Sequence, residues 1–210
     1  MTQTEKVSRT EVSKEYFDQI AKDYDTSFDG RYVRHMYPEL VERILEQNPK
    51  CVLDLGCGNG NVLAELISHK EIALYGADLS NNMIEEAKRR VPNGSFCVAN
   101  AEKLPYEDNT FDVIVCNASF HHYTNPVRVV EEMKRVLKKD GTLILGDPTA
   151  PSSLYLKVLN WTLKWMKSGD YHIYSKKEII GLLSRKSFKV TKFKKMGARN
   201  FILNASLYKQ

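Results

Sequence analysis

A short apolar run that ends in three closely spaced glycines places the strongest constraint on the fold of this chain. Residues 51–55 read Cys-Val-Leu-Asp-Leu, and Gly56, Gly58 and Gly60 follow within five positions. An apolar run of this length bounded by glycine is typical of a buried strand. The apolar residues within 62–67 share one face of a helix. The sequence therefore predicts a strand, a glycine turn and a helix in direct succession.

The same alternation continues along the middle of the chain. Parallel strands need helical crossovers, so alternating strands and helices predict a largely parallel sheet with helices on both faces. Further strands are expected at 72–77, 96–98, 111–116 and 142–145, the last after a turn at Asp140-Gly141. Intervening helices are expected at 80–90, where Ser80 is a suitable N-cap, and at 126–138.

The two ends of the chain depart from this alternation. Two helices, 10–24 and 33–47, are expected before the first strand. Helices at 152–167 and 175–186 and strands at 188–193 and 201–208 are expected after the last crossover, and the segment 196–200 reads as a hairpin turn between these strands. An antiparallel edge is therefore expected at the C-terminal side of the sheet.

Charge and composition limit the class of protein. With 210 residues and 42% hydrophobic residues, the chain suits one globular domain. Residues 157–210 hold 13 of the 31 basic residues and two of the 26 acidic ones. Such a split favours an anionic substrate, a membrane surface, nucleic acid, or simply a solvated lysine face. The four cysteines lack metal-ligand spacing, so no metal site is expected, and the lack of an apolar leader suggests a cytoplasmic protein.

Two acidic residues define the ligand that the glycine turn can hold. A dinucleotide fingerprint would need a third glycine at position 61, which is Asn61. Asp54 would repel a pyrophosphate but would attract an ammonium or sulfonium cation. Asp78, at the end of the second strand, can accept hydrogen bonds from both hydroxyls of a ribose. These features predict a cationic amino-acid nucleoside as the ligand.

At this point the sequence resembles the class I S-adenosylmethionine-dependent methyltransferases, and within them the small-molecule branch similar to the ubiquinone and menaquinone biosynthesis enzymes. The segments that carry the resemblance are 52–60, 76–80 with Met83, 100–105, 111–115 and 137–143. The resemblance implies a Rossmann-like α/β fold with a seven-stranded, mostly parallel sheet, an antiparallel C-terminal strand and an N-terminal helical cap. It also implies methyl transfer from S-adenosylmethionine to a small-molecule acceptor by in-line displacement.

The resemblance further implies one domain over 1–210 with four parts. These are a helical cap (1–48), a cofactor-binding core (49–150), helices roofing the substrate (151–186) and the C-terminal hairpin (187–210). Asp78 is expected to hold the ribose, and Asn100 stands where the family usually has Asp. The residues implied to contact the cofactor are Tyr16, Tyr24, Asp54, Gly56, Cys57, Gly58, Asp78, Leu79, Met83, Asn100, Ala101, Glu102 and Asn117.

Catalysis of methyl transfer requires alignment of the acceptor with the methyl group and exclusion of water. An acceptor that loses a proton needs a base in addition. The candidates are His121 and His122, on the loop after the fourth strand and therefore near the cofactor. An alternative is that one of them only packs or hydrogen-bonds within that loop.

The acceptor is indicated less clearly. Residues 117–120, Asn-Ala-Ser-Phe, differ from the motif of base-amine methyltransferases, so nucleic acid is disfavoured as a partner. The segment 153–166 is rich in large apolar residues, and we expect Tyr155, Trp161 and Trp165 either to line a pocket for an apolar acceptor or to pack in the core. Lys157 and Lys164 on one helical face also permit peripheral membrane contact.

Two other functions stay open at this point. One is an RNA methyltransferase that uses the basic C-terminal third, and the other is a non-catalytic homologue that only binds the cofactor. The acceptor, its reacting atom and the oligomeric state are not indicated by the sequence.

Overall fold

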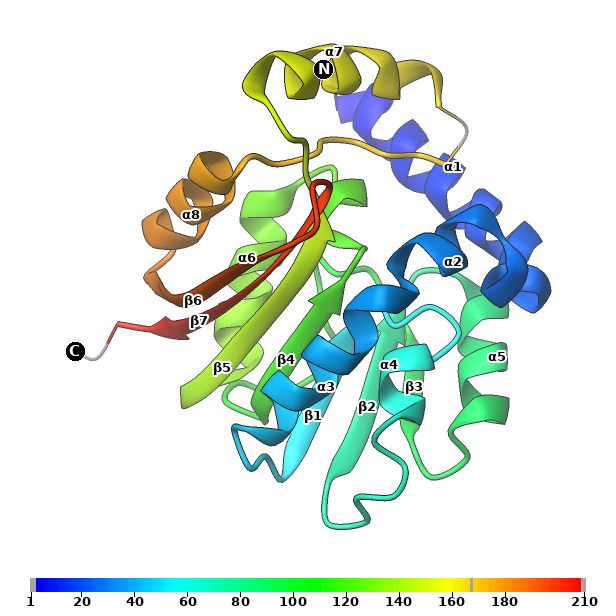
Figure 1. The fold of residues 1–210 in the computed structure, drawn as a ribbon. Coiled ribbons are helices and arrows are strands. Elements are labelled where there is room, and N and C mark those ends of the chain that lie inside the picture. Colours follow the sequence, from blue (N-terminus) through cyan, green and yellow to red (C-terminus); the bar gives the residue numbers. More distant parts are fainter. Residues whose placement is uncertain (1–2, 167, 209–210) are drawn as a thin grey trace.

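Seven strands form one sheet in the order β3-β2-β1-β4-β5-β7-β6 in the computed structural model, which describes residues 3–166 and 168–208 (Figure 1). The strands β1 to β5 pair in parallel, and β7 is antiparallel to both of its neighbours, β5 and β6. This confirms the expected fold class. The strands are β1 Cys51–Leu55, β2 Ala73–Asp78, β3 Ser95–Val98, β4 Phe111–Asn117, β5 Leu137–Pro148, β6 Phe188–Met196 and β7 Asn200–Leu207.

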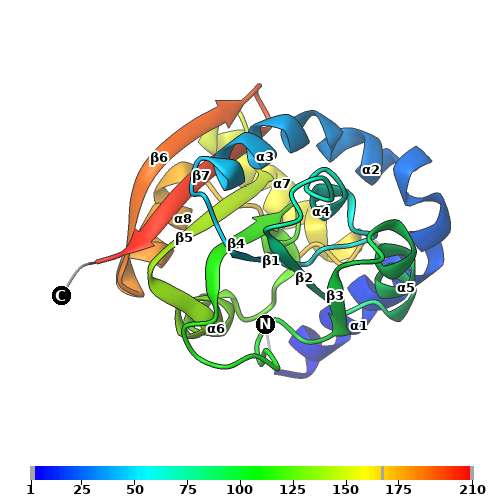
Figure 2. The same cartoon turned by 90° about the horizontal axis from the view of Figure 1, so that it is seen from below.

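Helices cover both faces of the sheet. Because side chains alternate along a strand, Leu53 joins an apolar cluster on one face and Val52 joins a second cluster on the other. Figure 2 shows α3 and α4 on one side and α6 on the other. The α-helices are α1 Gln3–Ile20, α2 Phe28–Val33, α3 Tyr37–Leu45, α4 Asn61–Ala64, α5 Asn81–Arg90, α6 Pro126–Val136, α7 Ser153–Thr162 and α8 Lys176–Arg185, and the 3-10 segments are η1 Ala21–Thr26, η2 Arg34–Met36, η3 Phe120–His122 and η4 Leu163–Trp165.

The N-terminal helices differ from the expected pair. The first begins at Gln3, and η1 replaces its expected last turn. The expected helix 33–47 is broken into α2, η2 and α3, with Pro38 in the first turn of α3. Proline lacks an N–H and is tolerated only in the first turn of a helix, so a continuous helix through Pro38 is disfavoured.

The strand β5 is also longer than expected. Phe111 pairs with Leu137 and Val113 with Thr142, so the intervening residues of β5 form a bulge against a single residue of β4. The expected turn at Asp140-Gly141 is therefore wrong, because both residues lie inside the strand. The expected helix 126–138 correspondingly ends at Val136.

Two elements lie beyond the carboxyl ends of the parallel strands. Figure 1 shows α7 above the end of β5, and α1 runs from beneath α7 toward α5. The expected helix 152–167 appears as α7 and η4, and its last residue lies outside the described part of the chain. Among the described residues no helix combines the length and the apolar character needed to cross a bilayer.

Candidate active site

The glycine turn after β1 forms the floor of a first cavity, with a volume of about 1030 Å³ including its mouth. The backbone N–H groups of Gly56 and Cys57 donate to the Ala77 carbonyl at 2.8 and 3.2 Å, which fixes the turn against the end of β2. Gly56 has φ +73° and Gly58 has φ +52°, in the left-handed region that favours glycine. A Cβ at Gly56 would lie 1.9 Å from Ser119 Oγ. The turn therefore cannot form this way with a larger residue at position 56.

Two buried carboxyl groups lie at this turn. Burial, together with Asp78, raises the pKa of Asp54 to about 8. Burial raises the pKa of Asp78 as well, although its two oxygens accept from the N–H groups of Gly58 and Ser80 at 2.9 Å each. Two buried acidic groups, of which Asp78 opposes ionisation of Asp54, provide a site for a positively charged ligand.

Amide side chains supply further polar atoms to the first cavity. Asn59 and Asn117 line it, and the Oδ1 atom of each is buried without a hydrogen-bond partner. Buried polar atoms are nearly always paired in proteins, so these oxygens indicate that a ligand completes the site. Asn100 Oδ1 already accepts from the Glu102 N–H at 2.9 Å, which leaves it one lone pair.

Every residue implied to contact the cofactor, apart from Tyr16, lines the first cavity. Tyr16 instead lines a neighbouring cavity, where its hydroxyl donates to Asp29 Oδ2 at 2.7 Å. The structure thus brings together residues from the ends of β1, β2 and β4 and from the cap. Their contact with a cofactor stays a prediction.

An interaction that the sequence did not indicate holds the cap over the glycine turn. Asp25 Oδ1 accepts from Asn59 Nδ2 at 2.9 Å and from Asn61 Nδ2 at 2.8 Å, and Arg90 contacts Oδ2 at 2.7 Å. Although burial acts to raise the pKa of Asp25, these donors lower it to about 2. Asp25 therefore links η1 to the turn and to the end of α5.

A second cavity of about 1350 Å³, including open solvent, adjoins the first and shares Phe17, Tyr24 and His122 with it. Its wall is rich in aromatic side chains from α1, α2 and α7, including Tyr32 and Tyr155. An aromatic wall beside the cofactor cavity suits an acceptor with an apolar body.

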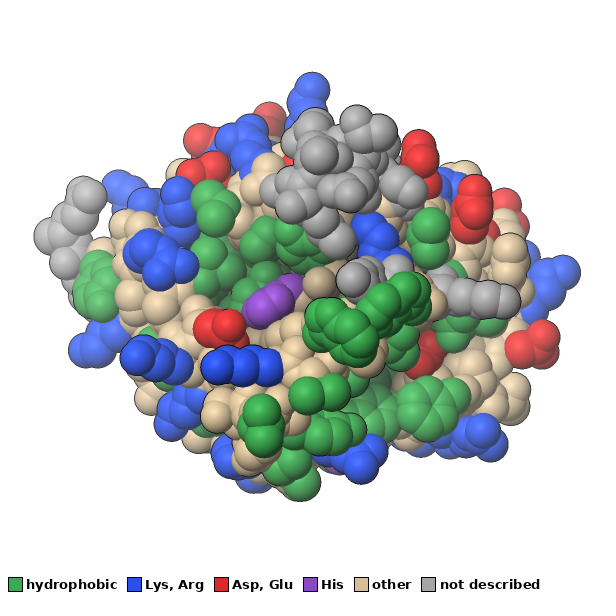
Figure 3. Space-filling view, turned by 90° about the horizontal axis from the view of Figure 1, so that it is seen from above, with side chains coloured by type: hydrophobic (Ala, Val, Ile, Leu, Met, Phe, Trp, Pro, Cys, Tyr) green, Lys and Arg blue, Asp and Glu red, His purple; other side chains and the backbone are tan. Residues whose placement is uncertain are grey.

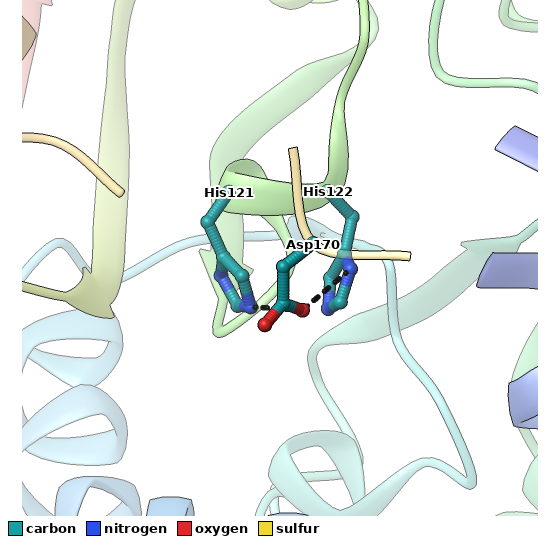
Figure 4. A group of neighbouring side chains, drawn as sticks. All are labelled: His121, His122 and Asp170. Carbon is teal, nitrogen blue, oxygen red and sulfur yellow. Dashed lines mark ion pairs between the residues drawn. The ribbon is translucent and has the colours of Figure 1, made fainter. Parts of the chain in front are cut away.

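The two candidate histidines lie at the second cavity beside Asp170 (Figure 4), and His121 also contacts the buried Asp147. The Nδ1 atom of His121 lies 2.9 Å from Asp147 Oδ1, and its Nε2 atom lies 3.7 Å from Asp170 Oδ1. The Nδ1 atom of His122 lies 3.3 Å from the same Asp170 oxygen. We refer to His121, His122 and Asp170 as the histidine cluster. The loop thus presents both predicted histidines to the acceptor side.

The histidine cluster has an uneven charge distribution. Burial lowers the pKa of His121, but Asp147 and Asp170 outweigh this effect and raise it to about 9. Burial and the neighbouring His121 lower the pKa of His122 to about 3. At neutral pH the first ring is therefore charged and the second is not.

Sequence reasoning missed both carboxylates of this region. Asp170 lies far along the chain, and the N–H groups of Tyr171 and His172 donate to the His121 carbonyl at 2.9 and 3.0 Å, which brings its segment to the loop. No local spacing could indicate this contact. Asp147 offered a signal, because it is a charged residue that ends an apolar run at the carboxyl end of a strand.

The helix α7 and the following η4 present their large side chains mainly to solvent. Trp161 is 63% exposed and Trp165 is 60% exposed, with their ring centroids 4.6 Å apart. Figure 3 shows hydrophobic side chains gathered on this face beside lysine and arginine. Tyr155 lines the second cavity as expected. The expectation that the tryptophans lie in the core or line a pocket is wrong, and the Lys164 side chain lies outside the described residues.

Comparison with known proteins decides the family. Residues 53–145 match the family described as the methyltransferase domain. The chain is 35% identical over 176 residues to the demethylmenaquinone methyltransferase of Thermotoga maritima, covering 75% of each chain. The chain belongs to the class I S-adenosylmethionine-dependent methyltransferases. It is thus an enzyme that methylates small molecules, and the RNA and non-catalytic alternatives are not favoured.

Other relatives of this methyltransferase agree. It is 28% identical over 193 residues to the demethylmenaquinone methyltransferase of Chlorobaculum tepidum, covering 86% of this chain and 74% of the relative. The crystal structure of the YcgJ protein from Bacillus subtilis superposes with a TM-score of 0.72 at 18% identity, covering 84% of this chain and 99% of that one. The second comparison supports the fold alone.

Proposed function

We propose that S-adenosylmethionine binds in the first cavity, with its positively charged methionine part beside Asp54 and Asp78. The observation that carries this proposal is the pair of buried carboxyl groups, Asp54 and Asp78, at the glycine turn. Asp78 would bind the ribose hydroxyls, while Leu79 and Met83 would cover the adenine. Asn117, which lines the same cavity, would lie at the reacting end. The bound cofactor supplies an electrophilic methyl group.

The acceptor enters the second cavity in this proposal. The shared wall at Phe17, Tyr24 and His122 brings the two ligands together, and the aromatic lining favours an acceptor with an apolar, ring-containing body. The demethylmenaquinone methyltransferases among the relatives are consistent with such an acceptor. Alignment of the two ligands and exclusion of water are then the main catalytic contributions of this chain.

His121 and His122 assist removal of a proton from the acceptor in the same proposal, with the uncharged His122 as the group that accepts the proton and the charged His121 beside it. His122 lines both cavities, so its ring lies where the acceptor and the cofactor meet. His121 lines the second cavity and is held by Asp147. A hydroxyl or carbon acid that reacts here would have a proton acceptor within reach.

The four segments of the chain around the site have different proposed roles. We propose that residues 1–48 act as the cap, 49–150 as the cofactor-binding core, 151–186 as the substrate roof and 187–210 as the closing hairpin. The exposed apolar face of α7, beside Lys157, suits contact with an anionic membrane from which an apolar acceptor is drawn. The enzyme itself is proposed to act in the cytoplasm.

Calorimetry with S-adenosylmethionine tests the proposed cofactor site. We expect micromolar affinity in the wild-type protein. Asp78→Asn should weaken it by about 1.5 kcal/mol or more, roughly tenfold, because charge-assisted hydrogen bonds to the ribose are lost. Asp108→Asn, on the exposed loop before β4, serves as the control and should bind normally. Unchanged affinity in the Asp78 variant would place the ribose elsewhere.

A further inference from the structure

We propose that the histidine cluster is a binding site for a divalent transition-metal ion. The inference goes beyond the proposed methyl transfer, no step of which needs a metal. Its position beside the acceptor rests on the proposed function, whereas the binding itself does not. The cluster stands at the wall of the second cavity, where all three of its residues contribute to the lining.

The spacing of the donor atoms in the histidine cluster suits a metal ion. Each of the three residues offers one ligand atom, and all three atoms lie within 4.8 Å of one another. Ligand atoms bound to zinc at about 2.0–2.2 Å lie roughly 3–4 Å apart. The distances of 3.7 Å from His121 Nε2 and 3.3 Å from His122 Nδ1 to Asp170 Oδ1 fall in this range. A small adjustment of the rings would therefore enclose an ion.

A carboxylate holds the His121 ring in place. Its Nδ1 atom pairs with Asp147 Oδ1 at 2.9 Å, in a contact where the ring N–H donates to the carboxylate. The Nε2 atom faces Asp170 Oδ1 at 3.7 Å, and an ion that binds there displaces the proton of this nitrogen. A metal-binding histidine commonly donates its other N–H to a carboxylate in this way, which fixes the ring and its tautomer.

One nitrogen of the cluster, His122 Nδ1, has no hydrogen-bond partner. His122 Nδ1 is buried and makes no hydrogen bond, although an oxygen of Asp170 lies 3.3 Å away. The His122 side chain is only 10% exposed, so water reaches it poorly. A buried polar atom without a partner is unfavourable. A cation between the nitrogen and the carboxylate would bind both.

The donor set selects the type of ion. Two imidazole nitrogens and one carboxylate suit Zn²⁺, Co²⁺ or Ni²⁺ better than Mg²⁺ or Ca²⁺, which prefer oxygen ligands. Three protein ligands leave at least one position open toward the second cavity. Because the same ring nitrogens are proposed to assist removal of the acceptor's proton, a bound ion should inhibit methyl transfer.

The test is metal titration of the full-length protein after treatment with a chelator. Binding of Co²⁺ is followed by absorption and binding of Zn²⁺ by calorimetry, with one ion expected per chain. Asp147→Asn should weaken the affinity by roughly 10–100-fold, the usual effect of losing an orienting partner. His122→Gln and Asp170→Asn remove ligands and should weaken it further.

His69→Gln is the matched control, because His69 precedes β2 at the opposite end of the sheet. It should bind the metals as the wild-type protein does. Circular dichroism of the same samples reports whether each variant is folded, independently of cofactor binding, and Asp170 does not line the first cavity. If either His122→Gln or Asp170→Asn fails to fold, the other variant still tests whether the cluster binds the metal.

Three results would overturn the inference. These are the lack of any Co²⁺ absorption or Zn²⁺ heat, unchanged affinity in a folded ligand variant, and thiolate charge-transfer bands, which would assign the ion to a cysteine. Failure of the proposed function gives a different pattern. In that case the metal binds and depends on the cluster, but the metal-free protein neither binds S-adenosylmethionine nor transfers its methyl group.

Discussion

Gly56 and Gly58 share a left-handed backbone but differ in the space around them. A Cβ at Gly56 would meet Ser119 Oγ at 1.9 Å, whereas at Gly58 the nearest atom is Met83 Sδ at 4.0 Å. Gly58→Ala should therefore lower the free energy of unfolding only by about 1–2 kcal/mol, the backbone cost. Gly56→Ala should lower it by more, because the clash adds to the same cost. Denaturant titration of both variants measures the difference, and equal losses would contradict the argument.

Asp54 makes the free energy of unfolding of the enzyme depend on pH. Its pKa is about 8 in the folded chain, against an ordinary value of 3.8. Between these values the folded state holds a proton that the unfolded state has lost. The free energy of unfolding should therefore fall as pH rises from about 4 to 8, by up to about 1.4 kcal/mol per pH unit.

The substitution Asp54→Asn tests this dependence. It should flatten the decline in the free energy of unfolding between pH 4 and 8, as measured by denaturant titration at several pH values. The exposed Asp23 provides the matched variant, Asp23→Asn, which should keep the wild-type slope. A slope that persists in the Asp54 variant would assign the dependence to another group.

The sequence predicted the cofactor side of the site better than the acceptor side. Asp54, Gly56 and Asp78 lie at the ends of strands that local patterns reveal, so their convergence follows from a parallel sheet. Asp25 and Asp170 reach the site through the cap and a distant loop. Only tertiary packing sets those contacts, and no spacing in the sequence records it.

At the scale of elements, the Asp25 carboxylate links η1 to the glycine turn and to α5. Asp25 contacts Asn59, Asn61 and Arg90, and its side chain is 34% exposed. Asp25→Ala should loosen the cap and speed release of S-adenosylmethionine several-fold, while the free energy of unfolding falls by about 1–3 kcal/mol or less. Stopped-flow release and hydrogen exchange of η1 measure this. An unchanged release rate would show that the cap does not retain the cofactor.

Loss of the tryptophans in α7 and η4 should have little effect on the stability of the enzyme. Burial of a tryptophan is worth about 3–5 kcal/mol, but Trp161 and Trp165 are mostly exposed. Trp161→Ala with Trp165→Ala should therefore leave the melting temperature nearly unchanged and reduce sedimentation with anionic vesicles. Leu156→Ala, at a buried position of the same helix, should instead lower the melting temperature. Unaltered vesicle binding in the double variant would argue against membrane contact.

Boundaries of elements were predicted less well than their order. The expected limits of α5 and α8 were close to those observed. Ser80, the expected N-cap, accepts an N–H group in the first turn of α5, and Ser175 does the same in α8. Pairing instead extended β5 along β7 through seven residue pairs, well beyond its apolar centre. Partners in a sheet set the length of a strand, and the partner of β5 lies far away in the sequence.

At the scale of the whole molecule, the alternation of strands and helices was enough to predict the sheet and its two covered faces. The glycine turn and the acidic residues then located the binding edge. The position of the cap and of α7 over that edge was implied by the family resemblance and not by local sequence patterns, because neither element pairs with a strand. Their placement depends on side-chain contacts such as those of Arg9 with the carbonyls of Met166 and Asp170.

The insertion of β7 between β5 and β6 has a consequence for synthesis of the chain. The strand β6 leaves the ribosome before β7, yet its place at the edge of the sheet exists only after β7 has joined β5. Until then β5 remains an open edge that could pair with another chain. Nascent chains are therefore most exposed to aggregation late in translation, when the binding edge of the sheet can already be formed.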